Sequence, residues 1–442
     1  MKSVDKYQPT IGLEIHAELN TASKMFCGCA NPVTQPGGGL ELKPNSLVCP
    51  VCLGLPGALP FANEQAIVKT YLIAQAVGCK LAENTHWERK NYFYPDLPKG
   101  FQISQYACPI GEHGKLAHVA VRRVHLEEDT GKLIHPANTD YSLVDYNRSG
   151  VPLVELVTEP EITSSKQAAD FAREYQMVLR YLGVSSADME KGQLRVEANI
   201  SINMGTKVEI KNLNSFKTVE RAIEYEIKRQ KQILEKGDTV IQETRGWHEA
   251  KQETFPQRVK ETESDYRYFP EPDLPPISDK YKKQAERIQL PELPGGKRAK
   301  LVSLGVPNHY ASVLVANPQL LKRFEQLTDH RPKQLQNLAR IMVNRPEIRV
   351  KSDKEILALA ELPDHKLKLA LEGKTLEEKE VTTKELILVM SRIITKHPKA
   401  VADFRLGKQE ALGFLLGQVK RELPHIDPQL VLTELHKVLK KK

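Results

Sequence analysis

A nine-residue segment near the amino terminus, IGLEIHAEL (residues 11–19), alternates aliphatic and polar side chains with a period of two. This pattern is typical of a half-buried β-strand. Because successive side chains of a strand point to opposite faces, Glu14, His16 and Glu18 are expected on one face and the aliphatic residues in a core. Two carboxylates and an imidazole suit the binding of a hard cation or the movement of protons. The alternative is a solvated polar face that contains one histidine.

Further strands and helices are predicted across the first 290 residues. Strand-like alternation recurs in residues 117–126, 153–157, 194–202 and 207–211. Helical periodicity is found in residues 63–77, 164–182 and 215–236. Because these elements do not alternate as regular βαβ units, the sequence predicts an α+β domain built on a mostly antiparallel sheet with flanking helices.

A domain boundary is predicted where proline and glycine are dense. Between Pro270 and Gly296 the chain has six prolines and two adjacent glycines, a composition that interrupts regular structure. Helical periodicity dominates beyond this segment, so the remainder is expected to be all-α.

Charge is unevenly distributed along the chain, whose net charge is +8. Residues 281–442 contain 31 Lys and Arg against 19 Asp and Glu, whereas residues 1–280 contain 33 against 37. The basic carboxy-terminal part suggests a polyanionic partner, with a lysine-rich solvated surface as the alternative. No apolar run approaches the roughly 20 residues that span a bilayer, and MKSVDKYQPT lacks the apolar core of a signal peptide. A cytoplasmic location without membrane attachment is therefore expected.

Four of the six cysteines form two close pairs, which predicts a metal site. A C-x-C pair and a C-x-x-C pair are separated by a glycine-containing loop, as in structural zinc sites with four thiolates. Four unrelated cysteines are the alternative. The candidate zinc ligands are Cys27, Cys29, Cys49 and Cys52, whereas Cys79 and Cys108 are expected to be buried apolar residues.

Acidic residues lie within or directly after the other predicted strands. Glu155 is the most informative, because a carboxylate inside an aliphatic run is costly to bury unless a cation or a donor compensates. Glu197 and Glu209 lie on alternating segments, and Glu127 and Glu128 follow a strand, where a polar turn is the alternative.

Two segments, 88–106 and 263–276, combine aromatic, basic and proline residues. Their side chains could contact phosphate, ribose or a nucleobase, or the segments could simply cover a sheet. The candidate substrate-binding residues are Arg89, Lys90, Tyr92, Lys99 and Arg267. The chain has neither a Walker A loop nor a dinucleotide-binding glycine motif, so phosphoryl chemistry would need a carboxylate-held metal.

Together these segments closely resemble the B subunits of aspartyl/glutamyl-tRNA amidotransferases. The resemblance covers almost all of the first 290 residues, and residues 398–419 are similar to the family's carboxy-terminal domains. The matching blocks are IGLEIHAEL, VCPVCLGLPGALP (48–60), RKNYFYPDLPKGFQISQY (89–106), HLEEDTGK (125–132), DYNRSGVPLVELVTEPE (145–161), EIKNLNSF (209–216) and DYRYFPEPDLPP (265–276).

The resemblance implies an ATP-dependent carbon–nitrogen ligase with glutamine as amide donor. ATP and Mg²⁺ would phosphorylate the side-chain carboxylate of Glu-tRNA(Gln), Asp-tRNA(Asn) or both. Ammonia channelled from an A subunit would then form the amide, and a small C subunit would brace the complex. The implied domains are a cradle domain (1–292), a helical domain (293–380) and a tRNA-binding tail domain (381–442).

The family's site positions carry over to a set of strand-borne residues in this chain. The implied active-site residues are Glu14, His16, Glu127, Glu128 and Glu155. The implied Mg²⁺ ligands are Glu14, His16, Glu128, Glu155, Glu197 and Glu209. Many relatives have Asp at position 197, so the longer side chain here could alter one metal contact.

Two other functional classes compete with this interpretation. A non-catalytic RNA-binding scaffold would explain the cysteines and the basic tail, but it has no need of desolvated carboxylates. A metal-dependent nuclease could use the same carboxylates and would degrade tRNA.

Overall fold

The computed structural model of the chain describes residues 6–36, 42–259, 266–328, 335–371, 383–406, 408, 410–423, 426 and 428–440. The chain divides into two compact units, Met1–Ala299 and Lys300–Lys442. This division follows residue 299, and the domain boundary after residue 292 that the family resemblance implies stays a prediction. The second predicted boundary, at residue 380, lies outside the described residues.

The first unit is built on a nine-stranded sheet with the order β13-β12-β11-β10-β1-β9-β6-β5-β2. Every neighbouring pair is antiparallel except β11 and β12, which confirms the predicted mostly antiparallel α+β architecture. The strands are β1 (Pro9–Glu18), β2 (Lys80–Leu81), β5 (Gly111–Leu116), β6 (Val119–Glu128), β9 (Pro152–Thr158), β10 (Leu194–Ile202), β11 (Val208–Leu213), β12 (Glu243–His248) and β13 (Glu253–Val259).

The central position of β1 explains its sequence pattern. Ile11, Leu13 and Ile15 are fully buried in the core, on the face opposite Glu14 and His16. These two polar residues are only partly exposed, because neighbouring strands and loops surround them. The polar face of β1 therefore belongs to the interior of the unit, which argues against the solvated-face alternative.

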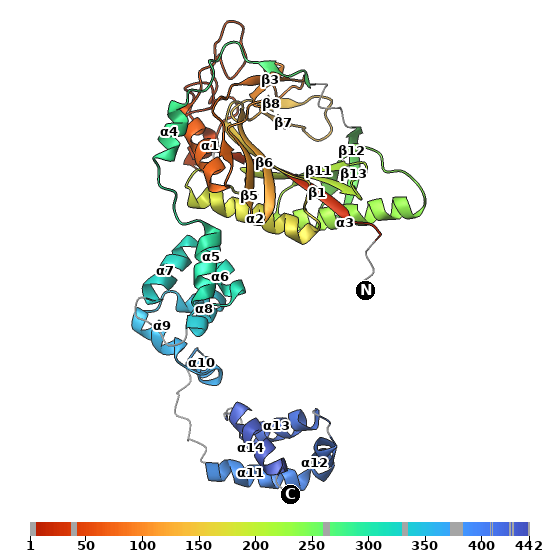
Figure 1. Cartoon of the computed structure of the whole chain (residues 1–442), viewed down its shortest axis with the longest axis vertical. Coiled ribbons are helices and arrows are strands. Elements are labelled where there is room, and N and C mark those ends of the chain that lie inside the picture. The colour runs from red at the N-terminus through yellow and green to blue at the C-terminus, as the bar shows by residue number, and fades with distance from the viewer. Residues whose placement is uncertain are drawn as a thin grey trace. The chain divides into compact units, whose positions relative to one another are not determined.

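Helices α2 (Ser165–Tyr181) and α3 (Phe216–Glu235) lie along one face of the sheet (Figure 1). Ser164 and Ser215 cap them, because each hydroxyl accepts a hydrogen bond from a first-turn backbone amide. Helix α1 (Glu64–Ala76) packs against β5, β6 and α4 (Lys280–Glu286) and contributes to the same core. The core thus fixes the backbone of the central strands from one side and leaves their other face for polar side chains.

A smaller three-stranded sheet, β14-β3-β4, faces the central strands through the packing of β4 on β6. Its strands are β3 (Glu88–Asn91), β4 (Phe101–Ser104) and β14 (Phe269–Pro270), and a separate hairpin is formed by β7 (Lys132–Ile134) and β8 (Leu143–Asp145). The single-turn 3₁₀ helix η1 (Pro32–Thr34) lies in the loop between β1 and α1.

The proline-rich segment after residue 270 packs onto the first unit instead of forming an irregular linker. It contains helix α4, and Leu274, Ile277 and Ala285 belong to the core of that unit. Prolines interrupt the hydrogen-bond ladder of a sheet, but the apolar side chains between them can still be buried. Helix α5 (Pro294–Ser303) begins directly after this segment.

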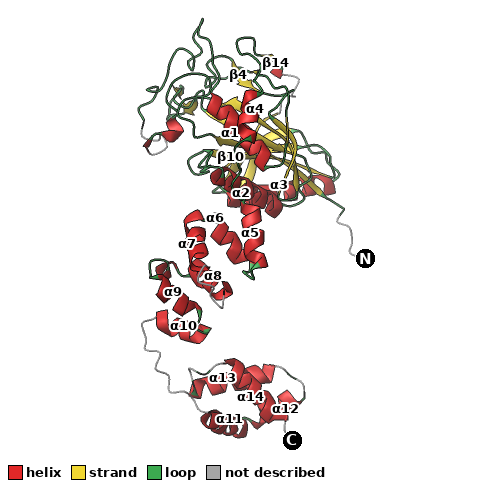
Figure 2. Cartoon of the chain, turned by 60° about the vertical axis from the view of Figure 1, so that its left-hand side comes forward, coloured by secondary structure: helices red, strands yellow, loops and turns green. Residues whose placement is uncertain are grey.

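The second unit is entirely helical in its described residues, as the sequence predicts (Figure 2). Its first helices are α6 (Asn308–Ala316), α7 (Pro318–Thr328), α8 (Leu335–Asn344), the 3₁₀ helix η4 (Pro346–Ile348), α9 (Asp353–Ala360) and α10 (Asp364–Leu371). The remaining helices are α11 (Thr383–Lys396), α12 (Pro398–Arg405), α13 (Glu410–Glu422) and α14 (Pro428–Lys440). Helices α11, α13 and α14 share a core of their own, which includes Met390, Leu415 and Leu435. Among the described residues, no helix is both long and apolar enough to cross a membrane.

Candidate functional site

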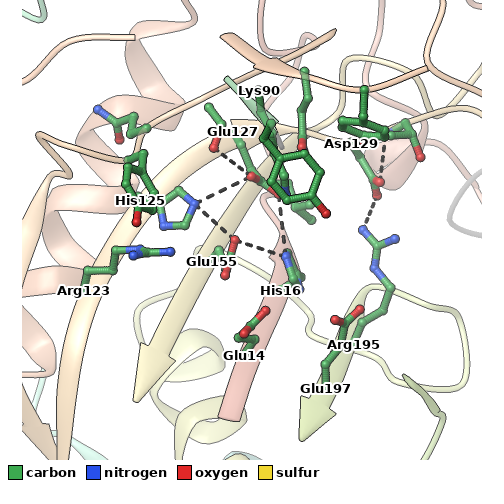
Figure 3. A pocket seen from close by; sticks show the side chains of 18 of the residues that line it. Glu14, His16, Lys90, Arg123, His125, Glu127, Asp129, Glu155, Arg195 and Glu197 are labelled. Atoms are coloured by element: carbon green, nitrogen blue, oxygen red, sulfur yellow. Dashed lines mark hydrogen bonds and ion pairs between the residues drawn. The ribbon is translucent and has the colours of Figure 1, made fainter. Parts of the chain in front are cut away.

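A cavity of about 510 Å³ lies over the polar face of the central strands (Figure 3). Lys90 of β3 and Tyr92, which directly follows this strand, contribute to its walls together with Tyr266 and Tyr268. Polar residues from five adjacent strands also line it: Glu14, His16, His125, Glu127, Glu155, Glu197 and Glu209. The cavity therefore brings together most of the acidic residues that the sequence singles out.

Strand register places Glu155 between two histidines. His16 of β1 and His125 of β6 are both direct cross-strand neighbours of Glu155 on β9. The Nε2 atoms of His16 and His125 lie 3.3 Å and 3.1 Å from Glu155 Oε2. Glu127 is the second carboxylate of this group, with the same Nε2 atoms 3.7 Å and 3.6 Å from its oxygens. Two carboxylates thus share two imidazoles.

The electrostatics of this group follow from its burial and its opposite charges. Burial opposes the charged form of His16, but Glu155 and then Glu127 outweigh it and raise the pKa of His16 to about 9. Burial also opposes ionisation of Glu155, but His125 and His16 hold the pKa of Glu155 well below its usual value. The carboxylates are therefore ionised at neutral pH despite being almost completely buried.

A second acidic group lies beside the first. Glu14 of β1 is the direct cross-strand neighbour of Glu197 on β10, and Glu209 on β11 completes the group. Lys211 Nζ lies 2.8 Å from Glu197 and 3.8 Å from Glu209. Burial and the neighbouring carboxylates raise the pKa of Glu14, to which Asn199 Nδ2 donates a hydrogen bond of 2.8 Å. This group therefore has a lysine as its neutralising partner where the first has imidazoles.

Both groups offer suitable atoms for a metal ion. In each, three ligand atoms lie within 4.8 Å of one another, from His16, Glu127 and Glu155 in the first and from the three glutamates in the second. We call these groups the histidine triad and the glutamate triad. Mg²⁺ prefers carboxylate oxygens, which are all three donors of the glutamate triad and two of the three donors of the histidine triad, where the third is the His16 nitrogen. The ammonium of Lys211 occupies space near the glutamate triad and would compete with an ion there.

Glu128 lies apart from the other acidic candidates. It follows Glu127 on β6, so its side chain points to the opposite face of the sheet. Its carboxylate lies 2.6 Å from Lys99 Nζ and accepts a hydrogen bond of 3.0 Å from the amide of Ile103. It lines a separate cavity of about 340 Å³. The structure therefore does not bring Glu128 to either triad, although the sequence predicts it as a Mg²⁺ ligand.

The predicted substrate-binding residues are also divided between locations. Lys90 and Tyr92 line the main cavity, and the Lys90 ammonium lies 4.9 Å from the centroid of the Tyr266 ring. Arg89 instead forms a bidentate pair with Glu271, with both N–O distances at 2.8 Å. Lys99 pairs with Glu128, and Arg267 is exposed and does not line the cavity.

Two features of the cavity were missed by the sequence prediction. His125 is buried and contacts both carboxylates of the histidine triad. The available signal was its spacing, because His125 and Glu127 are two residues apart on one strand.

The second missed feature is an ion pair, in which Asp129 pairs with Arg195 at 2.6 Å. Burial opposes ionisation of Asp129, but the charge of Arg195 outweighs it and lowers the pKa of Asp129 to about 2. Glu18, which the sequence left outside the site, is buried near this pair and does not line the cavity.

The four paired cysteines meet in a single cluster, with their sulfur atoms within 4.8 Å of one another. Four thiolates at this spacing fit a tetrahedral zinc ion. Lys24 is fully buried nearby, and its ammonium donates to the Tyr146 carbonyl at 3.2 Å. A hydrogen bond from Cys27, helped by the charge of Lys24, lowers the pKa of Cys52 to about 4, although burial opposes this. The other two cysteines, Cys79 and Cys108, are only partly buried, whereas the sequence predicts buried apolar residues.

Comparisons with known proteins agree with this architecture. Residues 9–283 match the family model described as the GatB/GatE catalytic domain, and residues 311–439 match the one described as the GatB domain. A protein of Caldanaerobacter subterraneus, named as the B subunit of aspartyl/glutamyl-tRNA(Asn/Gln) amidotransferase, is 40% identical over 98% of this chain and 100% of its own length. Proteins of the same name from Thermotoga maritima and Carboxydothermus hydrogenoformans are each 41% identical. These matches cover 98% and 94% of this chain and 99% and 95% of the relatives.

The matches span both units and nearly the full length of the relatives, and they agree with the resemblance carried by the sequence blocks. The chain belongs to the family of aspartyl/glutamyl-tRNA(Asn/Gln) amidotransferase B subunits.

Proposed function

We propose that this chain, as the B component of an amidotransferase, uses ATP and Mg²⁺ to phosphorylate the side-chain carboxylate of a mischarged Glu-tRNA(Gln) or Asp-tRNA(Asn). Ammonia, released from glutamine by an A subunit, then displaces phosphate to form the amide. The observation that carries the proposal is the histidine triad, in which Glu127 and Glu155 are buried yet held ionised by two imidazoles. A binding scaffold gains nothing from such desolvated carboxylates, because burying them costs free energy.

The proposed reaction depends on positioning and charge neutralisation. In the first step a carboxylate oxygen of the aminoacyl group bonds to the γ-phosphorus of ATP, and the bond to ADP breaks. In the second step ammonia bonds to the acyl carbon, phosphate leaves, and the nitrogen loses a proton. Mg²⁺ bound by His16, Glu127 and Glu155 would neutralise phosphate charge, which is its general role in phosphoryl transfer.

The residues of the cavity have separate parts in this proposal. His125 holds Glu155 in position from the side opposite His16. Lys90, at the tyrosine-lined wall, offers its ammonium to the phosphates of ATP or the backbone of the tRNA end. The glutamate triad is a second candidate Mg²⁺ site, whose occupancy is governed by Lys211. Tyr92, Tyr266 and Tyr268 limit the access of water, which favours transfer to ammonia.

The cysteine cluster has a structural role in the proposal. Its four sulfur atoms leave no position open for a substrate, as in closed zinc sites, and none of them lines the main cavity. We assign it zinc, with the cation of Lys24 offsetting part of the thiolate charge.

The proposed partners follow from the same chemistry. Glutamine hydrolysis requires an A subunit, with a C subunit that braces the complex, and the assembly is expected in the cytoplasm. The basic carboxy-terminal part is proposed to bind the tRNA backbone. Truncation after residue 380 removes helices α11–α14 with their own core, so it should weaken tRNA binding and flatten its salt dependence. Unchanged affinity and salt slope would identify this part as an ordinary solvated surface.

The central test compares two glutamates of similar burial. In the complex with the A and C subunits, Glu155→Gln should lower the rate of amide formation on mischarged tRNA by about 10²- to 10³-fold, as expected when a preorganised charge is lost. Glu128→Gln is the matched control, because Glu128 is similarly buried but outside both triads. Equal rates for the Glu155 variant and the wild type would sink the proposal. Metal-dependent loss of intact tRNA would instead favour a nuclease.

A further inference from the structure

Among the residues that the structure describes, Arg123 lacks the carboxylate partner that two other cations of the cavity, Arg195 and Lys211, have. Arg195 pairs with Asp129 at 2.6 Å, and Lys211 pairs with Glu197 at 2.8 Å. Arg123 lines the same cavity but forms no ion pair with any described residue. Its Nε atom is buried and has no hydrogen-bond partner in the described part of the chain. A buried donor without an acceptor costs free energy, so this arrangement needs an explanation.

Aromatic stacking positions Arg123 in place of a carboxylate. Its guanidinium carbon lies 5.3 Å from the centroid of the Tyr106 ring. Tyr106 in turn stacks on Tyr268, with the ring centroids 4.7 Å apart and the planes inclined by 18°. A cation held over an aromatic ring is stabilised through the ring's π face, whereas a carboxylate partner would occupy its N–H groups. The tyrosines therefore orient Arg123 without using its hydrogen-bond donors.

The strand places this arginine next to the histidine triad. Arg123, His125 and Glu127 are alternate residues of β6, so their side chains point to the same face. Figure 3 shows Arg123 beside His125, at one side of the group formed by His16 and Glu155. A ligand that contacts the triad is thus within reach of the guanidinium.

We propose that Arg123 binds an oxyanion of the substrates, with its N–H groups as donors and Tyr106 as its support. The inference rests on the proposed function, which supplies two such groups: a phosphate of ATP and the side-chain carboxylate of the aminoacyl-tRNA. Both accept two parallel hydrogen bonds from a guanidinium, and a lysine cannot reproduce this geometry.

The test uses the complex with the A and C subunits and a control on the same strand. Arg123→Gln removes the cation from the cavity. Arg122→Gln removes the same charge from outside the cavity, where Arg122 is exposed and paired with Glu159 at 2.7 Å. Calorimetry measures the Kd of a non-hydrolysable ATP analogue with Mg²⁺, and amide formation gives the KM for mischarged tRNA. Arg123→Gln should raise one of these constants by about 10- to 100-fold, and Arg122→Gln should change neither.

The two arms distinguish the source of the oxyanion. A higher Kd for the ATP analogue assigns Arg123 to phosphate, and a higher KM for the tRNA with an unchanged Kd assigns it to the carboxylate. Arg123→Lys should recover only part of the lost affinity, because a lysine keeps the positive charge but lacks the two parallel N–H donors of the guanidinium. If both constants of Arg123→Gln equal those of Arg122→Gln, the inference is wrong.

Two further results keep this inference separate from the proposed function. If Arg123→Gln does not assemble, Tyr106→Leu tests the same site with the arginine in place, and Tyr106→Phe, which keeps the ring, is its control. The leucine variant should raise the same constant by a smaller factor, and constants equal to those of the phenylalanine variant would overturn the inference. A wild-type complex that forms no amide would instead refute the proposed function.

Discussion

The histidine triad and the glutamate triad lie side by side on the same sheet but differ in how their negative charge is neutralised. In the histidine triad, Glu127 and Glu155 contact the imidazoles of His16 and His125. In the glutamate triad, Lys211 lies 2.8 Å from Glu197. An imidazole can lose its proton and become a metal ligand, whereas an ammonium offers only donors and repels a cation. The two triads therefore have similar carboxylates but should differ in their affinity for a metal ion.

This comparison predicts the order in which the two triads bind a divalent ion. The histidine triad should fill first, because its neutralising groups include a ligand. The glutamate triad should bind more weakly, since an ion must displace or repel Lys211. Mn²⁺ serves as a spectroscopic probe for both sites, because it shares the oxygen preference of Mg²⁺.

The largest change in Mn²⁺ affinity is expected when a ligand of the histidine triad is removed. His16→Ala should raise the Kd of the tighter Mn²⁺ site by more than about 100-fold. Loss of a residue that only supports a metal ligand typically costs about 10- to 100-fold in affinity, and His16 is itself a ligand. Glu209→Gln, in the other triad, should leave that site within a few-fold of wild type. Titration with Mn²⁺, in which electron paramagnetic resonance reports the free metal, measures the Kd of this site in both variants. Equal losses in the two variants would break the distinction between the triads.

Removing Lys211 should have a smaller effect on Mn²⁺ affinity, and in the opposite direction, because binding should tighten. Lys211→Met removes the competing ammonium, so Mn²⁺ binding at the glutamate triad should tighten by about tenfold. Without metal, the same variant should have a lower Tm, because the glutamates lose their counter-charge. Lys211→Arg keeps the charge and is the control. A glutamate triad that binds Mn²⁺ no better in the methionine variant would show that Lys211 does not govern its occupancy.

The smallest effect on the triads is expected from the cysteine cluster, which does not line their cavity. Cys49→Ser should abolish stoichiometric zinc, measured with a chromogenic chelator after unfolding. It should lower the Tm by about 5–10 °C, because a structural metal contributes folding free energy. Mn²⁺ affinity at the histidine triad should stay unchanged in the protein that remains folded. A large change there would mean that the cluster also shapes the cavity.

Local patterns predicted much of the fold. The strand at residues 11–19, the three helices α1, α2 and α3 and the all-α carboxy-terminal region follow from hydrophobic periodicity, and the structure confirms them. The proline-rich segment after residue 270 was harder to interpret. Its composition indicates irregular backbone, but burial of Leu274, Ile277 and Ala285 depends on a core formed by distant residues.

The sequence predicted the kinds of residue in the candidate site better than their exact positions in space. Glu14, His16, Glu127 and Glu155 were identified from strand alternation together with the family resemblance, and the structure brings them to one cavity. Glu128 was grouped with them through the family resemblance. A one-residue step along a strand reverses the face, so adjacency in sequence separates the two carboxylates in space.

Strand alternation alone placed most candidate cation ligands on their elements, because the period of two is a local property of the backbone. The sequence also determined the family, through long blocks of matching residues. The contacts of these residues became visible only in the folded chain: the two histidines around Glu155, Lys211 beside Glu197, and the tyrosine that supports Arg123. The reason is physical, since the register between strands far apart in the chain depends on packing of the whole core.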